Sequence, residues 1–202
     1  MAEEKKTQVA VIGAGPGGYP AAFRAADLGL DVTIIDPEAN PGGVCLYRGC
    51  IPSKALLHAA KVITEAEEAS RFGVSFEKPD IDIDKLRGWK DEVVGKLVGG
   101  LGQLAKQRKI RHVRGRAKFI DKNTLAIENE DGSAEQLEFE NAIIATGSRP
   151  AVISGLPASR NILDSTSALD LPDIPGSMLV VGGGYIGLEL GTVYAALGTE
   201  VS

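Results

Sequence analysis

The segment from Gln8 to Asp36 has the pattern of a complete β-α-β unit, and it limits the possible folds more than any other part of the chain. The apolar run Gln8 to Ile12 predicts a buried parallel strand. Small apolar residues then recur with helical period as far as Gly29, and Val32 to Ile35 predict a second strand. A glycine-rich turn, Gly13-Ala14-Gly15-Pro16-Gly17-Gly18, joins the first strand to the helix. This order predicts an α/β fold with a parallel sheet.

The glycine-rich turn has the spacing that binding a dinucleotide requires. Gly13 permits the tight turn, Gly15 lets the backbone approach a pyrophosphate, and Gly18 allows close packing of helix and strand. The helix N-terminus offers unpaired N–H groups to the phosphates, and Asp36 is placed to accept a hydrogen bond from a ribose hydroxyl. We therefore predict a dinucleotide site; the alternative is a purely structural glycine turn. Pro20 fits only if it lies in the first helical turn.

A second fingerprint of the same kind lies near the end of the chain. Met178 to Val181 predict a strand, and Gly182-x-Gly184-x-x-Gly187 opens a helix that runs to about Leu197. Two fingerprints indicate two dinucleotides bound by one polypeptide. Residues 153–175, rich in proline, are predicted to be a connector. The chain stops at Ser202 in what resembles a strand that has just begun, so we expect it to be part of a longer protein.

The middle of the chain is predicted to be scaffold. Helical patterns cover Pro52 to about Arg71 and Ile83 to Arg108. Four short strands with turn signals between them then suggest a β-meander inserted into the nucleotide domain: Ile110–Gly115, Ala117–Ile120, Thr124–Glu128 and Gln136–Phe139. Asn141 to Ala145 read as a return strand. Thr146-Gly147 at its end fits either backbone contact with a cofactor or an ordinary strand-ending turn.

The predicted fold is therefore α/β in two parts. Residues 1–150 form a Rossmann-like nucleotide-binding domain with a parallel sheet and the inserted β-meander. Residues 151–202 form the connector and the first β-α-β part of a second Rossmann-like domain.

Cys45 and Cys50 are the only cysteines, separated by four residues in a glycine-rich segment just after the first nucleotide site. A disulfide that closes so small a loop removes little entropy from the unfolded chain, so it would stabilise the fold poorly. The pair suggests electron transfer; two unpaired buried thiols or half of a zinc site are the alternatives. Because His58 and His112 are not spaced to complete a zinc site, we expect no metal.

The composition is that of a soluble globular protein. The formal net charge is -5 and 44% of the residues are hydrophobic, so there is no electrostatic case for nucleic acid binding. The N-terminus lacks the apolar core and cleavage site of a signal peptide. We expect a cytoplasmic protein that is not bound to a membrane.

Four ordered motifs together resemble those of the flavin-dependent pyridine nucleotide-disulfide oxidoreductases, over nearly the whole chain. They are Gly13 to Gly18, Cys45 to Leu57, Ala145 to Pro150, and Gly182 to Glu189. The resemblance implies FAD at the first site and NAD at the second, although the residue that tells NAD from NADP would lie beyond Ser202.

The resemblance also assigns roles around the cysteines. Cys50 would face the flavin ring, and Cys45 would be the interchange thiol that meets the substrate. Lys54 occupies the position of a buried lysine beside the flavin, and Glu189 matches its glutamate partner; a solvated helix residue is the alternative for Lys54. Tyr185 either shields the flavin face where nicotinamide docks or simply packs.

The resemblance also implies that the backbone near Ala117 borders the adenine of FAD, and that Ala145 to Gly147 are a second FAD fingerprint. The positions expected to contact FAD are Gly13, Gly15, Pro16, Gly17, Gly18, Asp36, Gly43, Val44, Cys45, Cys50, Lys54, Gly115, Ala117, Ala145, Thr146 and Gly147. Those expected at the second nucleotide or beside it are Gly182, Gly184, Tyr185, Ile186, Gly187 and Glu189.

The run Ile51 to Leu57 favours the branch of the family that oxidises dihydrolipoamide, carried on the lipoyl domain of a 2-oxoacid dehydrogenase complex. The family's catalytic base is a histidine in a His-Pro motif near the C-terminus of a homodimer, and neither histidine here has that context. We expect the chain alone to be inactive. The alternatives are reduction of glutathione, mercuric ion or another disulfide, and a cofactor-binding module without catalysis.

Overall fold

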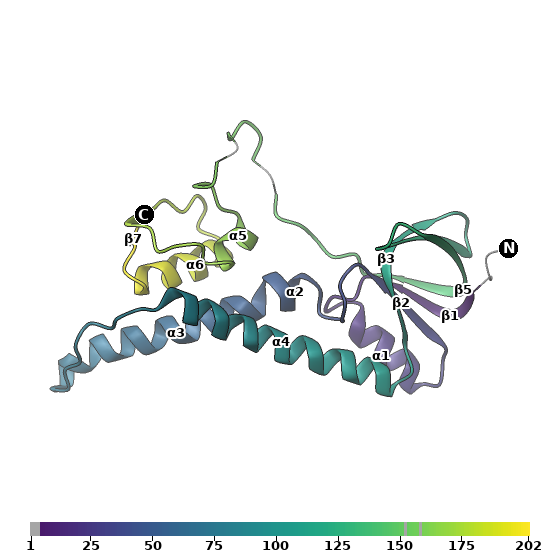
Figure 1. Cartoon of the computed structure of the whole chain (residues 1–202), viewed down its shortest axis with the longest axis horizontal. Coiled ribbons are helices and arrows are strands. Elements are labelled where there is room, and N and C mark those ends of the chain that lie inside the picture. Colours follow the sequence, from purple (N-terminus) through teal and green to yellow (C-terminus); the bar gives the residue numbers. More distant parts are fainter. Residues whose placement is uncertain (1–4, 152, 158) are drawn as a thin grey trace. The chain divides into compact units, whose positions relative to one another are not determined.

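The computed structural model describes residues 5–151, 153–157 and 159–202; residues 1–4, 152 and 158, in the expected N-terminal segment and around the connector, lie outside the description. The chain forms two compact units (Figure 1). Unit 1 comprises Met1–Tyr47 and Lys96–Ser148, and unit 2 comprises Arg48–Gly95 and Arg149–Ser202. Each unit is assembled from two separate stretches of sequence, whereas the two expected domains are continuous.

Unit 1 is built on a parallel-rich sheet. Its strands are β1 (Lys5–Ile12), β2 (Val32–Asp36), β3 (Arg111–Phe119), β4 (Thr124–Asn129) and β5 (Ala134–Ile144). β1 lies between β2 and β5 and is parallel to both, and β2 is parallel to β3. β4 pairs antiparallel with β3 and with β5, which closes the five strands into a ring of hydrogen-bonded neighbours. The predicted α/β class with a parallel sheet is confirmed.

β3 and β5 are each one continuous strand, so the predicted breaks near Arg116 and Glu140 are wrong. Arg111 to Arg114 pair with β2, and Gly115 to Phe119 pair with β4. The change of partner falls at Gly115, where a Cβ would lie 2.5 Å from the Glu128 carbonyl oxygen. β5 likewise pairs first with β4 and then with β1. A strand that changes partners keeps its extended backbone, and the alternation in sequence does not reveal this.

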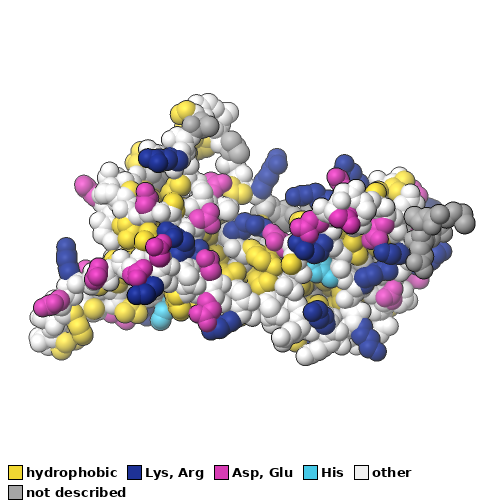
Figure 2. Space-filling view, in the orientation of Figure 1, with side chains coloured by type: hydrophobic (Ala, Val, Ile, Leu, Met, Phe, Trp, Pro, Cys, Tyr) yellow, Lys and Arg dark blue, Asp and Glu magenta, His cyan; other side chains and the backbone are white. Residues whose placement is uncertain are grey.

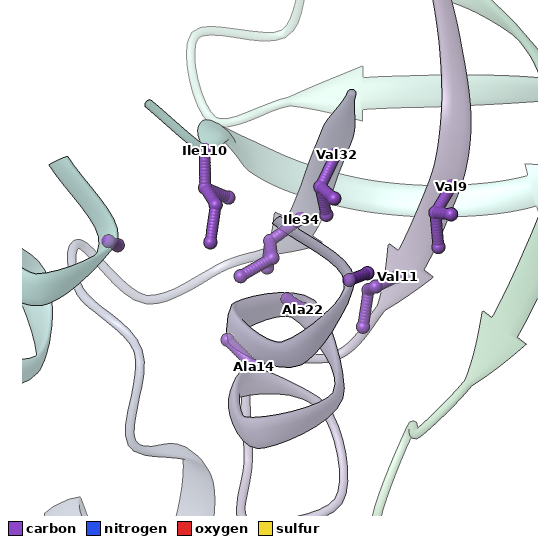
Figure 3. Close-up of a cluster of buried hydrophobic side chains, with 9 residues drawn as sticks. Val9, Val11, Ala14, Ala22, Val32, Ile34 and Ile110 are labelled. Carbon is purple, nitrogen blue, oxygen red and sulfur yellow. The ribbon is translucent and has the colours of Figure 1, made fainter. Parts of the chain in front are cut away.

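The core of unit 1 lies on both faces of the sheet. On one face, Ala22 of α1 (Tyr19–Asp27) packs against Val11, Val32 and Ile34, with Ile110 beside them (Figure 3). Pro20 lies in the first turn of α1, as the sequence requires. A second cluster fills the other face, where the antiparallel strands contribute: Ala10, Ile12, Ile35, Leu125, Ile127, Leu137 and Phe139.

Unit 2 is mostly helical, and its longest helix is α3 (Cys50–Glu68), which a short 3₁₀ helix η1 (Ala69–Phe72) extends. The short helix α2 (Gly43–Arg48) precedes α3 and belongs to unit 1 except for its last residue. α4 (Ile83–Gln107) begins in unit 2, continues into unit 1 from Lys96, and ends within one residue of its predicted end. α3 begins two residues earlier than predicted, because a proline at position 52 is tolerated within a first helical turn. None of the helices in the described part of the chain has both the length and the apolar character that crossing a bilayer requires.

The C-terminal part of unit 2 forms a small β-α-β element. β6 (Ser177–Met178) is parallel to β7 (Glu200–Val201), with α6 (Tyr185–Ala196) between them. The assigned strand β6 is shorter than the predicted Met178–Val181, although the Val180 N–H still donates to the Ser202 carbonyl oxygen at 2.8 Å. The predicted connector also holds a helix, α5 (Ser165–Leu169), which Asp164 starts with a capping box.

The core of unit 2 joins α3 and α6. Leu56 and Ala60 of α3 lie in one buried cluster with Leu190, Val193 and Tyr194 of α6. The Tyr194 hydroxyl donates to the Ala168 carbonyl oxygen at 3.0 Å, and burial raises the pKa of this hydroxyl to about 12. The packing of α3 on α6 brings Ser53 and Lys54 of α3 within hydrogen-bond distance of Glu189 of α6.

Candidate functional site

The first glycine turn is a close approach of backbone segments that only glycine permits. Gly13 has a φ of +99°, and a Cβ there would lie 2.2 Å from the Ala145 carbonyl oxygen. A Cβ on Gly18 would lie 1.8 Å from the Gly13 carbonyl oxygen. Side chains at either position would separate β1, α1 and the end of β5. The turn therefore has the local geometry that its spacing predicts.

The loop that precedes Cys45 lies against the same turn. The Gly42 N–H donates to the Ala14 carbonyl oxygen at 2.8 Å. Gly43 has a φ of +58°, and a Cβ there would lie 2.5 Å from the Gly15 Cα atom. Unit 1 thus brings Gly43 next to the fingerprint, although 27 residues of sequence lie between positions 15 and 43.

Asp36 contacts the turn directly. Its Oδ2 accepts a hydrogen bond of 2.7 Å from the Ala14 N–H, and its Oδ1 accepts one of 2.8 Å from the Glu38 N–H. The residue is only 8% exposed. A carboxylate has about four acceptor sites, so two backbone donors still leave it able to accept from a ribose hydroxyl. That contact stays a prediction, but the bond to Ala14 gives Asp36 a second role in shaping the turn.

Other predicted contacts of unit 1 lie on its strands or just after them: Gly115 and Ala117 within β3, and Ala145 directly after β5. Arg114 is the register partner of Asp36, so Gly115 follows directly beyond the carboxyl end of β2. The Ala145 N–H donates to the Ile12 carbonyl oxygen at 2.8 Å, which holds Ala145 at the carboxyl end of β1. In Rossmann-like folds, ligands bind beyond the carboxyl ends of the parallel strands. The lack of side chains at the glycines fits a pyrophosphate, which is bound by N–H groups rather than by side chains.

The second glycine turn repeats the geometry of the first. Gly182 has a φ of +111°, and a Cβ on Gly187 would lie 2.7 Å from the Gly182 carbonyl oxygen. Gly184 is the N-cap of α6. Tyr185 is 74% exposed and Ile186 is also exposed, so the described part of unit 2 does not bury either side chain.

Lys54 and Glu189 contact each other within unit 2. The Lys54 Nζ atom lies 2.5 Å from the Glu189 Oε1 atom, and the Ser53 hydroxyl donates to Oε2 at 2.6 Å. The hydrogen bonds from Lys54 and Ser53 hold the pKa of Glu189 below its usual range, and the bond to Glu189 raises the pKa of Lys54. The expected partner is therefore in contact. The expected burial of Lys54 is not seen, because its side chain leaves the outer face of α3 and is 60% exposed.

The two cysteines stand on consecutive helices, Cys45 on α2 and Cys50 at the first position of α3. Both are in the reduced form, so the predicted disulfide is not present in this structure. Cys50 is exposed and Cys45 is partly buried. Cys45 falls in unit 1 and Cys50 in unit 2.

The two histidines, His58 and His112, each lie in other surroundings. The His58 ring lies 6.2 Å from the Trp89 ring, centroid to centroid. His112 is mostly buried, its Nε2 atom has no hydrogen-bond partner, and burial lowers its pKa. Within residues 5–151, 153–157 and 159–202, no three His, Cys, Asp or Glu side chains gather in a way that could hold a metal ion.

A groove of about 750 Å³ in unit 1 lies away from the predicted contacts, beside the first residues of β1 and residues 138–140 in the middle of β5. Its polar groups bond to one another: the Thr7 hydroxyl donates to the Asp31 carbonyl oxygen, and the Asn123 amide donates to the Phe139 carbonyl oxygen.

Figure 2 shows basic and acidic side chains interspersed over the visible face.

Ser53 contacts Glu189 but is not among the residues that the sequence motifs predict for the site. The only signal for it in the sequence is a polar side chain on the apolar face of the helical pattern, between Pro52 and Lys54. The bond from the Ala14 N–H to Asp36 was also missed, since no side-chain pattern encodes it.

The parallel-rich sheet with a glycine turn at the carboxyl end of β1 defines an α/β protein of the Rossmann-like class. Residues 7–202 match the pyridine nucleotide-disulphide oxidoreductase family, and the chain belongs to this family. All 202 residues align with the dihydrolipoyl dehydrogenases of Haemophilus influenzae, at 54% identity, and Vibrio cholerae, at 52%. That of Geobacillus stearothermophilus is 51% identical over 197 residues. The chain spans 42% of the length of each of these relatives.

Proposed function

We propose that the protein containing this chain is a dihydrolipoyl dehydrogenase, a flavin-dependent enzyme that oxidises dihydrolipoamide with NAD as the final acceptor. The observation that carries the proposal is the identity of 54% with a protein of that name over all 202 residues. The substrate would be carried by the lipoyl domain of a 2-oxoacid dehydrogenase complex. We further propose that the whole protein is a cytoplasmic homodimer.

The cofactor sites follow from the two glycine turns. FAD would be held by residues 1–150: the turn at Gly13 to Gly18, Asp36, Gly43, Gly115 to Ala117 within β3, and Ala145 to Gly147 just after β5. The close backbone approaches at Gly13, Gly18, Gly43 and Gly115 support this assignment. The antiparallel strands β3, β4 and β5 would be the inserted β-meander. Residues 151–202 would be the connector and the start of an NAD-binding domain.

The chemistry begins with thiol–disulfide exchange at the cysteines. In the oxidised protein, a thiolate of dihydrolipoamide would attack the Cys45 sulfur of a Cys45–Cys50 disulfide and form a mixed disulfide. The second substrate thiol would then release lipoamide and leave both cysteines reduced, so that two electrons enter the chain. At its predicted site beside Cys50, a bound FAD would supply an acceptor for these two electrons and their transfer as hydride to NAD.

Lys54 and Glu189 would act on charge near Cys50. Lys54 lies one helical turn after Cys50 on α3, and the Glu189 carboxylate holds its ammonium group. A fixed positive charge at this position would stabilise the thiolate and the negative charge that two-electron reduction adds to the site. The proton of the incoming substrate thiol needs a base, which neither His58 nor His112 is placed to supply.

An absorption spectrum tests the flavin assignment. The whole protein, reconstituted with FAD and reduced by two electrons, should show a long-wavelength charge-transfer band between the Cys50 thiolate and the flavin. Cys50→Ser should abolish the band, whereas Cys45→Ser should keep it because the donor sulfur remains. A reduced, flavin-loaded protein without the band, or with an equal band in Cys50→Ser, would contradict the role given to Cys50.

Steady-state assays test the substrate. The whole protein should form NADH from dihydrolipoamide and NAD, and should reduce glutathione disulfide at least about a hundredfold more slowly, a loss of roughly 3 kcal/mol in transition-state stabilisation. Residues 1–202 alone should show no turnover. Equal turnover of glutathione disulfide would assign the protein to another branch of the family.

A further inference from the structure

Ser53 lies beside Lys54 on α3, but it faces the packed side of the helix. Ser53 is 5% exposed, and Ala55 and Leu56 nearby are also buried. A hydroxyl in such surroundings must find a hydrogen-bond partner, since burying it unpaired is unfavourable. The identity of that partner therefore shows what the hydroxyl does.

The Ser53 hydroxyl bonds outside its own helix. Serine and threonine within helices often bond to the carbonyl oxygen one turn earlier, as Thr64 does with the Ala60 carbonyl oxygen at 3.0 Å. The corresponding group for Ser53 is the Gly49 carbonyl oxygen, which accepts the Ser53 N–H at 3.0 Å. The hydroxyl instead donates to Glu189 Oε2 on α6, at 2.6 Å.

Both oxygens of the Glu189 carboxylate are engaged by neighbouring residues of one helix. Oε1 contacts the Lys54 ammonium group and Oε2 accepts from Ser53. Two contacts at opposite ends of a planar group determine its orientation, whereas Lys54 alone would leave it able to rotate. The packing of Leu56 of α3 against Leu190 of α6 keeps the two helices at the required distance.

We propose that Ser53 is a positioning residue of the Lys54–Glu189 pair: its hydroxyl holds the carboxylate so that Oε1 faces the Lys54 ammonium group. The proposal rests on the proposed function, in which Lys54 supplies a fixed positive charge near Cys50. Ser53 acts through Glu189 and touches neither substrate nor flavin in this scheme. The lowered pKa of Glu189, to which the bond from Ser53 contributes after that from Lys54, agrees with the geometry.

Titration of the Glu189 carboxyl group tests the proposal in the 202-residue chain. The ¹³C signal of the side-chain carboxyl of labelled glutamate is followed against pH, and Glu189→Gln identifies it. Ser53→Ala should move the midpoint upward because one bond to the ionised form is lost. Ser53→Thr, which keeps the hydroxyl, should restore the lower midpoint. Thr192→Ala is the matched control, since it removes a hydroxyl of α6 that bonds to the Leu188 carbonyl oxygen, and it should leave the midpoint unchanged.

Lys54→Met gives the reference shift of the Glu189 midpoint, because the bond from Lys54 is the largest cause of the lowered Glu189 pKa. An unchanged midpoint in Ser53→Ala beside a raised one in Lys54→Met would overturn the proposal, and so would a midpoint that Thr192→Ala moves equally. In the flavin-loaded whole protein, Ser53→Ala should weaken the charge-transfer band and Thr192→Ala should not. The titration needs no flavin, so it decides the role of Ser53 even where the proposed function fails.

Discussion

At the scale of single residues, two sets of glycines in this chain have opposite effects on stability. At Gly13, Gly18 and Gly187, a Cβ would overlap a backbone carbonyl oxygen. At Gly95, Gly99 and Gly100 of α4, a Cβ would meet no atom within 4 Å. The first group is needed for the fold, whereas the second only weakens the helix in which it lies.

Gly18→Ala should lower the free energy of unfolding by about 1–3 kcal/mol, because its Cβ would force the turn away from Gly13. Gly99→Ala should raise it by about 0.5–1 kcal/mol, since alanine loses less backbone entropy in a helix. Urea unfolding followed by circular dichroism measures both. If Gly18→Ala raised the free energy of unfolding as much as Gly99→Ala does, the clash at Gly18 would be relieved without cost.

His112 should make stability depend on pH. Burial, opposed by Asp36 and aided by Arg114, holds its folded-state pKa below the ordinary value of 6.5. The unfolded chain therefore binds more protons between the two pKa values, and stability falls as pH decreases through that window, by at most about 1.4 kcal/mol per pH unit.

His112→Val should remove this dependence, while His58→Gln, at an exposed position, should keep it. Urea midpoints at about pH 7.5 and about pH 5.5 give the comparison. A wild-type chain as stable at the lower as at the higher pH would refute the assignment.

At the scale of elements, side chains of α4 bind the C-terminal end of α5 and the residues that follow it. The buried Lys90 ammonium group donates to the Leu169 carbonyl oxygen at 2.9 Å and pairs with Asp91. Arg87 donates to the Leu171 carbonyl oxygen at 3.0 Å. These cations satisfy carbonyl groups at a helix C-terminus, where orphan acceptors favour positive charge.

Lys90→Met should destabilise unit 2 by about 1.5–3 kcal/mol, because the Leu169 carbonyl oxygen loses a charged donor in a buried place. Lys85→Met is the control: its ion pair with Asp82 is exposed to solvent, and its loss should change the free energy of unfolding little. The fluorescence of Trp89 in urea reports both. A loss for Lys90→Met no larger than that of the control would contradict the capping role.

At the scale of the whole molecule, the chain has two compact units, each with its own apolar clusters. Chains with separate cores commonly unfold in more than one step. Trp89, the only tryptophan, belongs to unit 2 and reports on that unit.

Leu56→Ala should therefore shift the Trp89 unfolding transition by about 2–4 kcal/mol, and Ile34→Ala should leave it in place while destabilising the circular dichroism transition by a similar amount. Both side chains are buried, at 1% and 0% exposure respectively, so the two substitutions are comparable. Simultaneous movement of both transitions in both variants would show that the units unfold as one.

The sequence alone determined the features whose causes are local. The glycine turns, the position of Pro20 and the lengths of α1 and α4 follow from backbone preferences and helical period, and the structure has them within a few residues. The pairing of helices and strands was less accessible, because period and alternation record which face is apolar and not which segment covers it.

Only the tertiary structure decided the contacts between distant segments. In the structure, the predicted short strands are joined into β3 and β5. The Ala14 N–H donates a hydrogen bond to Asp36, and the Ser53 hydroxyl donates one to Glu189, 136 residues away in sequence. Each of these depends on how two surfaces pack, and packing sums many weak contacts that no local pattern contains. The chain therefore specifies its glycine-rich turns residue by residue, whereas the environment of Lys54 exists only once α3 and α6 have packed.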